Sequence, residues 1–406
     1  MRDGLSGPGS KILHIMENEK HIDSIIGQFE SCFPGQNIFL INASKTNPLR
    51  FIRAVDKVIV ETYGSDEYRS YLDNMEHYRL VVFHNIHNPY KHDIILAAPG
   101  NALLCGSLWG NELYSFSFLR KSIYLPRTLR LLKYEMLLFY PKYLFKNLFL
   151  KGQIERKESK KRNVFRRLNI ICGIIPSEIT FFREISGSRA RGEVLSPYTL
   201  EYLLGNNLEE AGKISSTGRN ILFGNSANFS NNHLDLLADL AKIRFKVPKD
   251  LKVYCPLNYG SGTVRKHVMR EGRKRFKDQF IPITEFMPLE QYRDIIVDSS
   301  ILIMNHRKQA AFGTILIGLW MGAKVFLNEK NPLFPFFREN GITVFSVGRD
   351  LAGIGSITEP LPANSVRETR KNLVRLFGRE SVFTQITHLV GMADTMQRSG
   401  LKNRGW

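Results

Sequence analysis

The sequence predicts an α/β fold made of two domains, each built on a parallel sheet. Strand-like apolar runs alternate with helical patterns through both halves of the 406-residue chain, and such alternation is typical of parallel strands joined by helices. A polar stretch rich in Gly and Ser, 204–220, lies between the halves. With 43% hydrophobic residues, a chain of this length is able to bury two separate cores.

In the first half, apolar runs with the length and composition of buried strands predict a sheet. They are KILHIM (11–16), NIFLI (37–41), RLVVFHN (79–85), NALLCGSLWG (101–110) and NIICGII (169–175). Helical patterns are expected at 18–31, 64–77 and 176–185. These units predict a first domain at 11–204.

The alternation is more regular in the second half. The predicted strands are NILFGNS (220–226), LKVYCPL (251–257), QFIPIT (279–284), SILIMN (300–305), AKVFLN (323–328) and ITVFSV (342–347), and the helices between them are 231–243, 263–276, 288–298, 313–321 and 332–340. They predict a second domain at 220–365, after a linker at 205–219. C-terminal helices at 366–406 fit against either domain. Two such domains imply a cleft where ligands meet the carboxyl ends of the strands.

Several classes of protein are disfavoured by the sequence. No apolar run reaches the roughly 18 to 20 residues that span a bilayer, and no secretory signal pattern is found. MRDGLSGPGS, 1–10, is interpreted as a flexible leader or a cloning scar. The cysteines are far apart, without CxxC or metal-ligand spacing, and are predicted to be buried thiols of a reducing compartment. They are Cys32, Cys105, Cys172 and Cys255.

The positive charge is concentrated in one segment. Of a net charge of +19, a net of +12 comes from 120–167, where 15 Lys or Arg face 3 Glu. Within 116–167, Pro126 and Pro141 divide short helical pieces in which Phe, Tyr and Leu alternate with the basic residues. Such pieces suit an anionic membrane surface. The residues expected to face it are Arg120, Lys121, Arg127, Arg130, Lys133, Lys142 and Lys146. A solvated helical hairpin and a nucleic-acid patch are the alternatives, although no RNA or DNA module accompanies the segment.

Two loops of the second domain have the composition of a phosphate or sugar site. FGNSANFSNNH, 223–233, places Gly224, Asn225 and Ser226 between a strand and a helix, where free backbone amides and a positive helix end favour phosphate. A simple capping loop has the same pattern. Tyr259 follows the next strand in CPLNYGSG, 255–262. Since GSGTVR is not GxGxxG, no dinucleotide fingerprint is present and a dehydrogenase is disfavoured.

The segment MNHRKQAAFGT, 304–314, is the densest group of polar residues. Cationic side chains beside a helix start are able to neutralise a diphosphate leaving group without a metal. An exposed loop is the alternative. The residues concerned are Arg307, Lys308, Gln309, Gly313 and Thr314. Asn328 and Glu329 end the next strand, where they are placed to reach a sugar or ribose hydroxyl.

In the first domain, two loops carry candidate catalytic groups. FHNIHNP, 83–89, presents His84, Asn85 and Asn88 after a strand, and LWGNELY, 108–114, presents Trp109 and Glu112. A neutral imidazole or a carboxylate at a cleft edge is able to act as a general base. A structural hydrogen bond for His84 and a helix cap for Glu112 are the alternatives.

With these motifs in order, the chain resembles glycosyltransferase family 56, which transfers N-acetylfucosamine (4-acetamido-4,6-dideoxygalactose) from its dTDP derivative to lipid II of enterobacterial common antigen. The resemblance covers about 80–330. It runs through VVFHNIHNP, LWGNELY, GNSANFSNNH, MPLEQY, RKQAAFGT and VFLNEKNP. Within these motifs, Glu112 stands for an Asp of the family and Lys308 for an Arg, and the basic segment is longer.

The resemblance implies the GT-B fold: two Rossmann-like domains facing each other across a cleft. The basic amphipathic helical segment 116–167, which departs from the family, is expected to be an insertion in the N-terminal domain. The resemblance also implies an N-terminal acceptor domain, a C-terminal donor-nucleotide domain and no divalent metal or other cofactor. Many GT-B enzymes carry one acid two residues before Phe-Gly and another five after that Gly. Here those positions are Ala310 and Gly318, so the second acid's contact is assigned to Glu329 as a hypothesis.

The function expected from these observations is transfer of an N-acetylfucosamine-like sugar from a dTDP-sugar to an undecaprenyl-diphosphate-linked saccharide, in the synthesis of a bacterial surface polysaccharide such as enterobacterial common antigen or O-antigen. If the reaction inverts the anomeric centre, Glu112 or His84 is expected to be the catalytic group that positions or deprotonates the acceptor hydroxyl, whereas a retaining reaction needs no dedicated base. Asn85, Asn88 and Trp109 are expected to bind the acceptor. The expected place is the cytoplasmic face of the inner membrane, as a peripheral protein without a nucleic-acid partner. The rivals are a GT-B enzyme with another donor, an epimerase, and a basic nucleic-acid-binding or scaffold protein.

Overall fold

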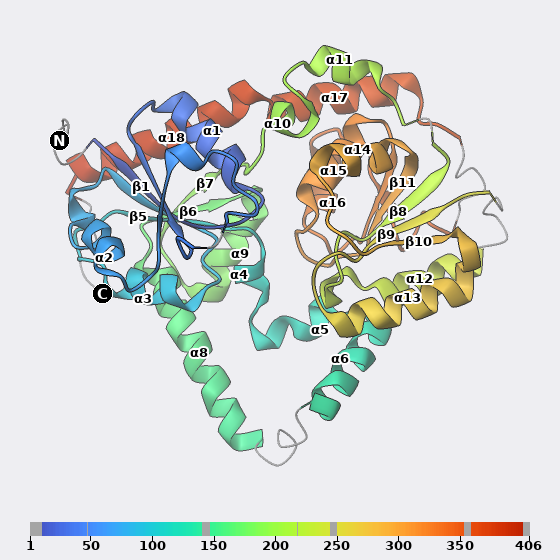
Figure 1. Ribbon diagram of the computed structural model, residues 1–406, viewed down its shortest axis with the longest axis horizontal. Coiled ribbons are helices and arrows are strands. Elements are labelled where there is room, and N and C mark those ends of the chain that lie inside the picture. The colour runs from blue at the N-terminus through green and yellow to red at the C-terminus, as the bar shows by residue number, and fades with distance from the viewer. Residues whose placement is uncertain are drawn as a thin grey trace. The chain divides into compact units, whose positions relative to one another are not determined.

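The computed structural model describes residues 10–46, 48–139, 147–216, 218–243, 250–352 and 359–400. The chain divides into two compact units, the first made of 1–115, 153–202 and 377–406 and the second of 116–152 and 203–376 (Figure 1). Each unit is built on its own parallel sheet with helices around it. The predicted α/β class is therefore confirmed.

Within the described residues, the sheet of the first unit has seven parallel strands in the order β3-β2-β1-β4-β5-β6-β7. They are β1 (Ile12–Glu17), β2 (Asn37–Asn42), β3 (Val58–Glu61), β4 (Leu80–His84), β5 (Leu104–Ser107), β6 (Ile170–Gly173) and β7 (Arg191–Val194). The sequence predicted all of them except β3 and β7, which form the two edges. The strand order reverses direction between β1 and β4, which lie side by side.

Helices cover both faces of this sheet. Their bounds are α1 (Ile22–Cys32), α2 (Asp66–Leu72), α3 (Pro89–Ala97), α4 (Asn111–Tyr114), α9 (Pro176–Ser186) and α18 (Arg379–Arg398), with short 3-10 turns η1 (Val55–Lys57) and η2 (Met75–His77). The predicted helix at 64–77 is interrupted, because α2 ends at Leu72. The apolar side chains of α1 and α18 share one core cluster with β1, β2 and β4, so the last helix completes the first unit.

The sheet of the second unit has the order β10-β9-β8-β11-β12-β13 within the part that the structure describes. Its strands are β8 (Asn220–Phe223), β9 (Val253–Pro256), β10 (Phe280–Ile283), β11 (Ser299–Met304), β12 (Lys324–Leu327) and β13 (Phe345–Ser346). Each strand lies within a run predicted from the sequence, except that β11 begins at Ser299, one residue before its predicted run. The strand order reverses between β8 and β11.

Helices α12 and α13 lie on one side of this sheet and α14, α15 and α16 on the other (Figure 1). Their bounds are α12 (His233–Ile243), α13 (Gly262–Phe276), α14 (Leu289–Val297), α15 (Phe312–Trp320) and α16 (Leu333–Glu339). Other short or connecting elements are α10 (Leu200–Leu204), α11 (Leu208–Lys213), η4 (Phe229–Asn231) and η6 (Lys277–Gln279), and α17 (Ala363–Phe377) follows later in the chain.

The basic segment is not an insertion in the N-terminal domain, as the sequence analysis expected. Its part 116–152 belongs to the second unit, and only 153–167 belongs to the first. Its elements are η3 (Ser117–Leu119), α5 (Arg120–Ile123), α6 (Pro126–Phe139) and α8 (Asn147–Arg167). The physical reason is that α6 packs on α12, and that Asp235 of α12 accepts hydrogen bonds from the backbone amides of Arg127 and Thr128.

The predicted linker at 205–219 and the predicted C-terminal helices also differ from the structure. Arg370 of α17 donates to the carbonyl oxygen atoms of Gly212 and Ile214, at 2.7 and 3.2 Å, and Ser216 donates its amide to Met321 at 2.7 Å. These bonds fix much of the polar stretch to the second unit. Helix α17 belongs to that unit up to residue 376, whereas α18 belongs to the first.

Candidate active site

The strand order of the second sheet reverses between β8 and β11. Strands β8 and β11 are neighbours there, and the amide of Gly224 donates to the carbonyl of Ile303 at 3.0 Å. In parallel α/β sheets, ligands bind outside the carboxyl ends of the strands at such a position. The loops that follow β8 and β11 contain most of the residues that the sequence predicted to bind a donor.

The loop after β8 is built around Gly224. This residue has a φ of 68°, and a Cβ atom on it would lie 2.4 Å from Nε2 of His233, so only glycine lets the backbone lie against the imidazole. Asn231 holds the loop by accepting from the amide of Asn225 at 2.9 Å and donating to Ser226 Oγ at 3.1 Å.

The loops after β8 and β9 are joined. Ala227 donates its amide to the carbonyl of Tyr259 at 2.7 Å, and Nδ2 of Asn225 lies 3.5 Å from the Tyr259 hydroxyl. The Tyr259 side chain is 43% exposed. The structure thus brings four predicted donor-binding residues together at one edge: Gly224, Asn225, Ser226 and Tyr259.

Helix α15 begins at the end of the loop after β11. Ala311 immediately before it has a φ of 59°, a left-handed conformation that costs an alanine about 1–2 kcal/mol. Gly313 and Thr314 lie in the first turn and are partly exposed, and Thr314 Oγ1 lies 3.5 Å from the hydroxyl of Tyr292. The start of this nine-residue helix therefore offers the positive dipole end that favours phosphate.

Cationic and amide side chains precede this helix start. Arg307 is partly buried, and its Nη1 donates to the carbonyl of Ser122 at 3.4 Å, which ties the loop to the basic segment. Lys308 is partly exposed and Gln309 is buried. In the described part of the chain, the Arg307 Nε atom and the Gln309 Oε1 atom have no hydrogen-bond partner.

Two buried histidines belong to the same region. His233 and His306 are 2% and 1% exposed, and burial lowers the pKa of each imidazole to about 3. Neither ring has a hydrogen-bond partner among the described residues. Because buried polar groups are nearly always paired, these neutral rings and the unpaired atoms of Arg307 and Gln309 indicate a place where a ligand or water supplies partners.

Asn328 and Glu329 follow β12. Asn328 donates from Nδ2 to Asn305 Oδ1 at 2.8 Å, so its amide joins the loops after β11 and β12. Glu329 accepts at Oε1 from the Ser346 hydroxyl at 2.5 Å and from Nε of Arg349 at 3.0 Å. Its side chain is 38% exposed, so the carboxylate is oriented by two donors yet remains accessible.

Gly318, the position of the missing second acid, lies on the buried side of α15. A Cβ atom there would lie 2.3 Å from Cδ2 of Leu302, itself fully buried in β11. A larger residue at this position therefore requires the buried Leu302 side chain to move. Position 318 faces the buried Leu302, so an acid here would be placed in the core of the second unit.

The reversal point of the first sheet holds a second group of polar side chains. Asn85 follows β4 with a φ of 58° and donates from Nδ2 to Glu19 Oε1 at 2.9 Å. Asn88 donates to Glu17 Oε2. The fully buried Lys91 of α3 donates to the carbonyl oxygen of Asn85 at 3.0 Å and lies 3.9 Å from Glu17 Oε2.

Glu17 and Glu19 were not among the residues singled out from the sequence. The signal for them was present, because they directly follow the apolar run KILHIM in the motif ENE. Polar residues after the first strand of a parallel sheet reach the same edge as those after its neighbour. Burial raises the pKa of the Glu19 carboxyl to about 7, against smaller opposing effects of Asn85 and Lys91.

Glu112 and His84, the predicted catalytic groups, are both buried. Glu112 is 0% exposed and accepts hydrogen bonds from the backbone amides of Ile86 at 3.0 Å and Trp109 at 3.1 Å, and burial raises its pKa. His84 is 1% exposed, with Nε2 3.0 Å from Nδ1 of His14, and burial lowers its pKa well below the usual range. Glu112 therefore joins the loops after β4 and β5.

Trp109 lies beside this carboxylate and is partly buried. Its ring packs edge-on against His21, with 4.7 Å between the ring centroids, and His21 in turn contacts Tyr198. The predicted acceptor residues Asn85, Asn88 and Trp109 therefore surround the same strand ends as Glu17 and Glu19.

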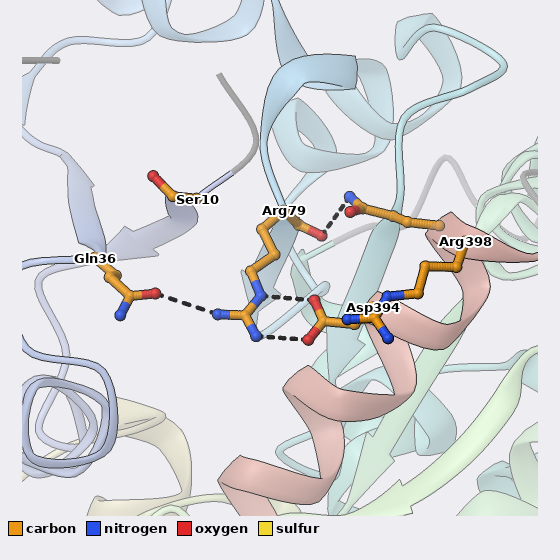
Figure 2. A pocket seen from close by; sticks show the side chains of 6 residues that line it. Ser10, Gln36, Arg79, Asp394 and Arg398 are labelled. Atoms are coloured by element: carbon orange, nitrogen blue, oxygen red, sulfur yellow. Dashed lines mark hydrogen bonds and ion pairs between the residues drawn. The ribbon is translucent and has the colours of Figure 1, made fainter. Parts of the chain in front are cut away.

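A hollow of about 370 Å³ lies elsewhere on the first unit (Figure 2). It is lined by Ser10, Gln36, Arg79, Asp394, Gln397 and Arg398. Arg79 donates to both carboxylate oxygen atoms of Asp394, at 2.7 and 2.6 Å, and to Gln36 at 3.2 Å. Three of these residues precede β1, β2 and β4, so the hollow lies at the opposite edge from the loops described above. Its paired charges fix α18 to the sheet.

The predicted membrane-facing residues lie on exposed parts of α5 and α6. Arg120, Lys121, Arg127, Arg130 and Lys133 are exposed, whereas Lys142 and Lys146 lie outside the described residues. In the described ranges, no helix is long and apolar enough to cross a bilayer. The same ranges contain no group of three or more His, Cys, Asp or Glu that could hold a metal ion.

Comparison with known proteins gives a family match over residues 175–397, more than half of the chain, to a model described as "4-alpha-L-fucosyltransferase glycosyl transferase group 56". This confirms the family suggested by the sequence motifs. The motifs around His84 and Trp109 precede the matched residues.

Solved structures with the same architecture cover nearly the whole chain. Sucrose-phosphate synthase from Thermosynechococcus elongatus has a TM-score of 0.65 at 10% identity, covering 95% of this chain and 99% of its own. HepE from Anabaena, in complex with UDP and glucose, has a TM-score of 0.61 at 10% identity, covering 94% of this chain and 100% of its own. A glycosyltransferase from Rickettsia africae has a TM-score of 0.61 at 12% identity, covering 94% of this chain and 98% of its own. These similarities confirm the GT-B fold.

Proposed function

The chain belongs to the glycosyltransferase group 56 family, and from this premise we propose that it transfers a deoxyamino sugar resembling N-acetylfucosamine from a dTDP-sugar to an undecaprenyl-diphosphate-linked saccharide. As a family member with the GT-B fold, it is a glycosyltransferase that takes a sugar nucleotide and a glycosyl acceptor. The observation that carries the proposal is the group of unpaired buried polar atoms before the start of α15, in the family-matched part of the chain.

The donor diphosphate is proposed to bind at the first turn of α15. Arg307, Lys308 and the amides of Gly313 and Thr314 supply positive charge next to the neutral side chain of Gln309. Charge-assisted hydrogen bonds of this kind stabilise a leaving diphosphate as the glycosidic bond breaks, so no divalent metal is required. That UDP is bound in the Anabaena structure is consistent with a nucleoside diphosphate in this fold.

The remaining donor residues have more specific proposed roles. Asn225 and Tyr259 bind the sugar or the base, since both lie at the carboxyl edge of β8 and β9 and Tyr259 is exposed. Glu329 accepts a hydroxyl of the ribose or the sugar, with Ser346 and Arg349 holding its carboxylate in place. A Glu329→Ala variant with unchanged donor affinity would contradict this role.

The acceptor is proposed to bind the first unit around Asn85, Asn88 and Trp109. His84 and Glu112 are buried beneath them and are proposed to act as positioning residues. Glu112 holds the loops after β4 and β5 through its two backbone hydrogen bonds. The exposed basic residues of α5 and α6 are proposed to attach the protein to the anionic cytoplasmic face of a bacterial inner membrane, where a lipid-linked acceptor of a surface polysaccharide is concentrated.

Binding of nucleotides tests the donor site. In a thermal-shift series with dTDP, UDP, GDP and a short RNA, we expect the largest stabilisation with dTDP. Gln309→Ala is expected to weaken dTDP binding, whereas Lys266→Ala, an exposed basic residue of α13, is expected to leave it unchanged. Stabilisation by RNA alone would support the nucleic-acid alternative, and no shift with any nucleoside diphosphate would contradict the proposal.

A further inference from the structure

Glu19 follows β1, one of the two neighbouring strands at which the first sheet reverses its order. Resting on the proposed function, we propose that Glu19 is the catalytic residue that takes the proton from the acceptor hydroxyl. Its carboxylate follows β1, and its Oε1 atom accepts from Nδ2 of Asn85, which follows β4. The hydrogen bond therefore joins the two loops that diverge at the reversal point, the place where ligands bind in such sheets.

The side chain of Glu19 is partly exposed, unlike the carboxylate of Glu112. A general base must come within hydrogen-bond reach of the hydroxyl that it deprotonates. Glu112 has no exposed surface and its oxygen atoms accept from two backbone amides. Of the two carboxylates, Glu19 is the one that an acceptor is able to reach.

Buried polar side chains next to Glu19 also indicate a ligand. His84, 1% exposed, directly precedes Asn85, and its Nδ1 atom has no hydrogen-bond partner in the described ranges. The same is true of Nε1 of Trp109 in the loop after β5. Because buried donors and acceptors are normally satisfied, these atoms point to an acceptor or ordered water at the reversal point of the first sheet.

The charges around Glu19 suit a base that works near neutral pH. Burial raises the pKa of its carboxyl to about 7, and the neighbouring carboxylates Glu17 and Glu112 act in the same direction, whereas the Asn85 hydrogen bond and the Lys91 ammonium oppose it. A base whose pKa is close to the working pH combines ionisation with proton affinity. Lys91 is fully buried and its ammonium donates to the carbonyl oxygen atoms of His84 and Asn85, so this cation is fixed.

The chemical step balances with these groups. The acceptor hydroxyl oxygen forms a bond to the anomeric carbon of the donor as the bond from that carbon to the diphosphate oxygen breaks. The electron pair of the broken bond leaves with the nucleoside diphosphate. The hydroxyl proton passes to the Glu19 carboxylate, from which it is later lost to solvent.

Glu19→Gln tests this assignment, with Glu67→Gln on the exposed side of α2 as the matched control. We expect Glu19→Gln to lower kcat about 100-fold or more, the range of general-base catalysis, while dTDP still stabilises the protein to thermal unfolding as in the wild type. Glu67→Gln is expected to retain wild-type turnover. Unchanged turnover in Glu19→Gln would overturn the role of Glu19 and leave the proposed function standing. A wild-type protein without any transferase activity would overturn the proposed function itself.

The pH profile provides a second, independent readout. In the wild type, kcat/KM is expected to fall about tenfold per pH unit below about pH 7, because a protonated Glu19 cannot accept the proton. Asn85→Gly keeps the left-handed backbone but removes the hydrogen bond that favours ionised Glu19. The acid limb of the profile, the range in which kcat/KM falls with decreasing pH, is therefore expected to move to higher pH. A limb that does not move in Asn85→Gly, or that persists in Glu19→Gln, would contradict the assignment.

Discussion

The carboxylate of Asp235 binds Thr128 twice, accepting from its backbone amide at 2.9 Å and from its hydroxyl at 2.7 Å. It also accepts from the amide of Arg127 at 2.9 Å, so Asp235 of α12 satisfies the free amides at the start of α6. Asn232, which directly precedes α12, accepts from the amide of Leu125 and donates to the carbonyl oxygen of Asn305. The start of α6 is thus held beside the loops after β8 and β11, where the donor is proposed to bind.

Removing this cap is expected to destabilise the second unit. Asp235→Ala leaves the Arg127 and Thr128 amides without their acceptor, and loss of a helix cap costs about 1–2 kcal/mol of the free energy of unfolding. Asp239→Ala on the same helix is the control, because Asp239 pairs with exposed Lys242 and such pairs contribute about 0–1 kcal/mol. Urea denaturation measures both, and equal losses would contradict the capping role.

The exposed basic residues of α6 are expected to determine membrane binding. Replacing Arg127, Arg130 and Lys133 by Gln removes three charges worth about 1 kcal/mol each near an anionic surface, so the partition coefficient is expected to fall roughly 100-fold. Cosedimentation with vesicles of phosphatidylglycerol measures the change. The control replaces Lys266, Arg273 and Lys274, three exposed basic residues of α13, by Gln. An equal fall of the partition coefficient in both triple variants would indicate that the net charge of the protein attracts it to the vesicles, and that α6 is not a specific membrane-binding surface.

Gly318 is expected to tolerate no larger residue. Gly318→Ala places a methyl group against the buried Leu302, and overpacking costs about 1–3 kcal/mol, more than the 0.5–1 kcal/mol that alanine normally adds to a helix. The control is Gly391→Ala on α18, where a Cβ atom meets nothing within 4 Å and alanine is expected to stabilise. Thermal unfolding should therefore shift in opposite directions, and a stabilising Gly318→Ala would contradict the packing argument.

The stability of the first unit is expected to depend on pH through Glu178. This carboxyl on α9 is 1% exposed, and burial raises its pKa from 4.5 to about 8. The folded state therefore holds a proton that the unfolded state releases, so the free energy of unfolding decreases as the pH rises from about 4.5 to about 8. Glu178→Gln removes this group, and its melting temperature should fall less between pH 6 and pH 8 than that of the wild type.

Glu184→Gln, on an exposed position of the same helix, is the control and is expected to follow the wild type over this pH range. Identical pH dependence in the wild type and Glu178→Gln would show that the buried carboxyl does not titrate on unfolding.

The central strands were predictable because they are continuous apolar runs buried on both faces. The edge strands β3 and β7 were not, since VIVE is only partly buried and RGEV carries two charged residues. The sequence also did not reveal which unit holds the basic segment. That depends on tertiary hydrogen bonds from Asn232 and Asp235 to backbone more than 100 residues away, which no local pattern encodes.

The candidate site was predictable to the level of loops. The structure places the polar residues predicted after apolar strands, including Asn225, Tyr259 and Asn85, in loops at the carboxyl ends of those strands. The sequence pattern could not show how exposed each carboxylate is. In the structure Glu112 is enclosed by backbone amides, whereas Glu19 remains accessible. Neither sequence position nor residue type indicates this difference, because it depends on how the loops after β4 and β5 fold over the carboxylate.

Analysis of the transfer product tests the central claim most directly. The protein is incubated with a dTDP-linked N-acetylfucosamine donor and an undecaprenyl-diphosphate-linked disaccharide in vesicles, with matched UDP- and GDP-sugars in parallel. The account predicts, by mass spectrometry, a lipid-linked product one sugar longer and one dTDP released per transfer, and only with the dTDP-sugar. Transfer from a UDP- or GDP-sugar alone, or conversion of the donor without transfer to the lipid, would contradict it.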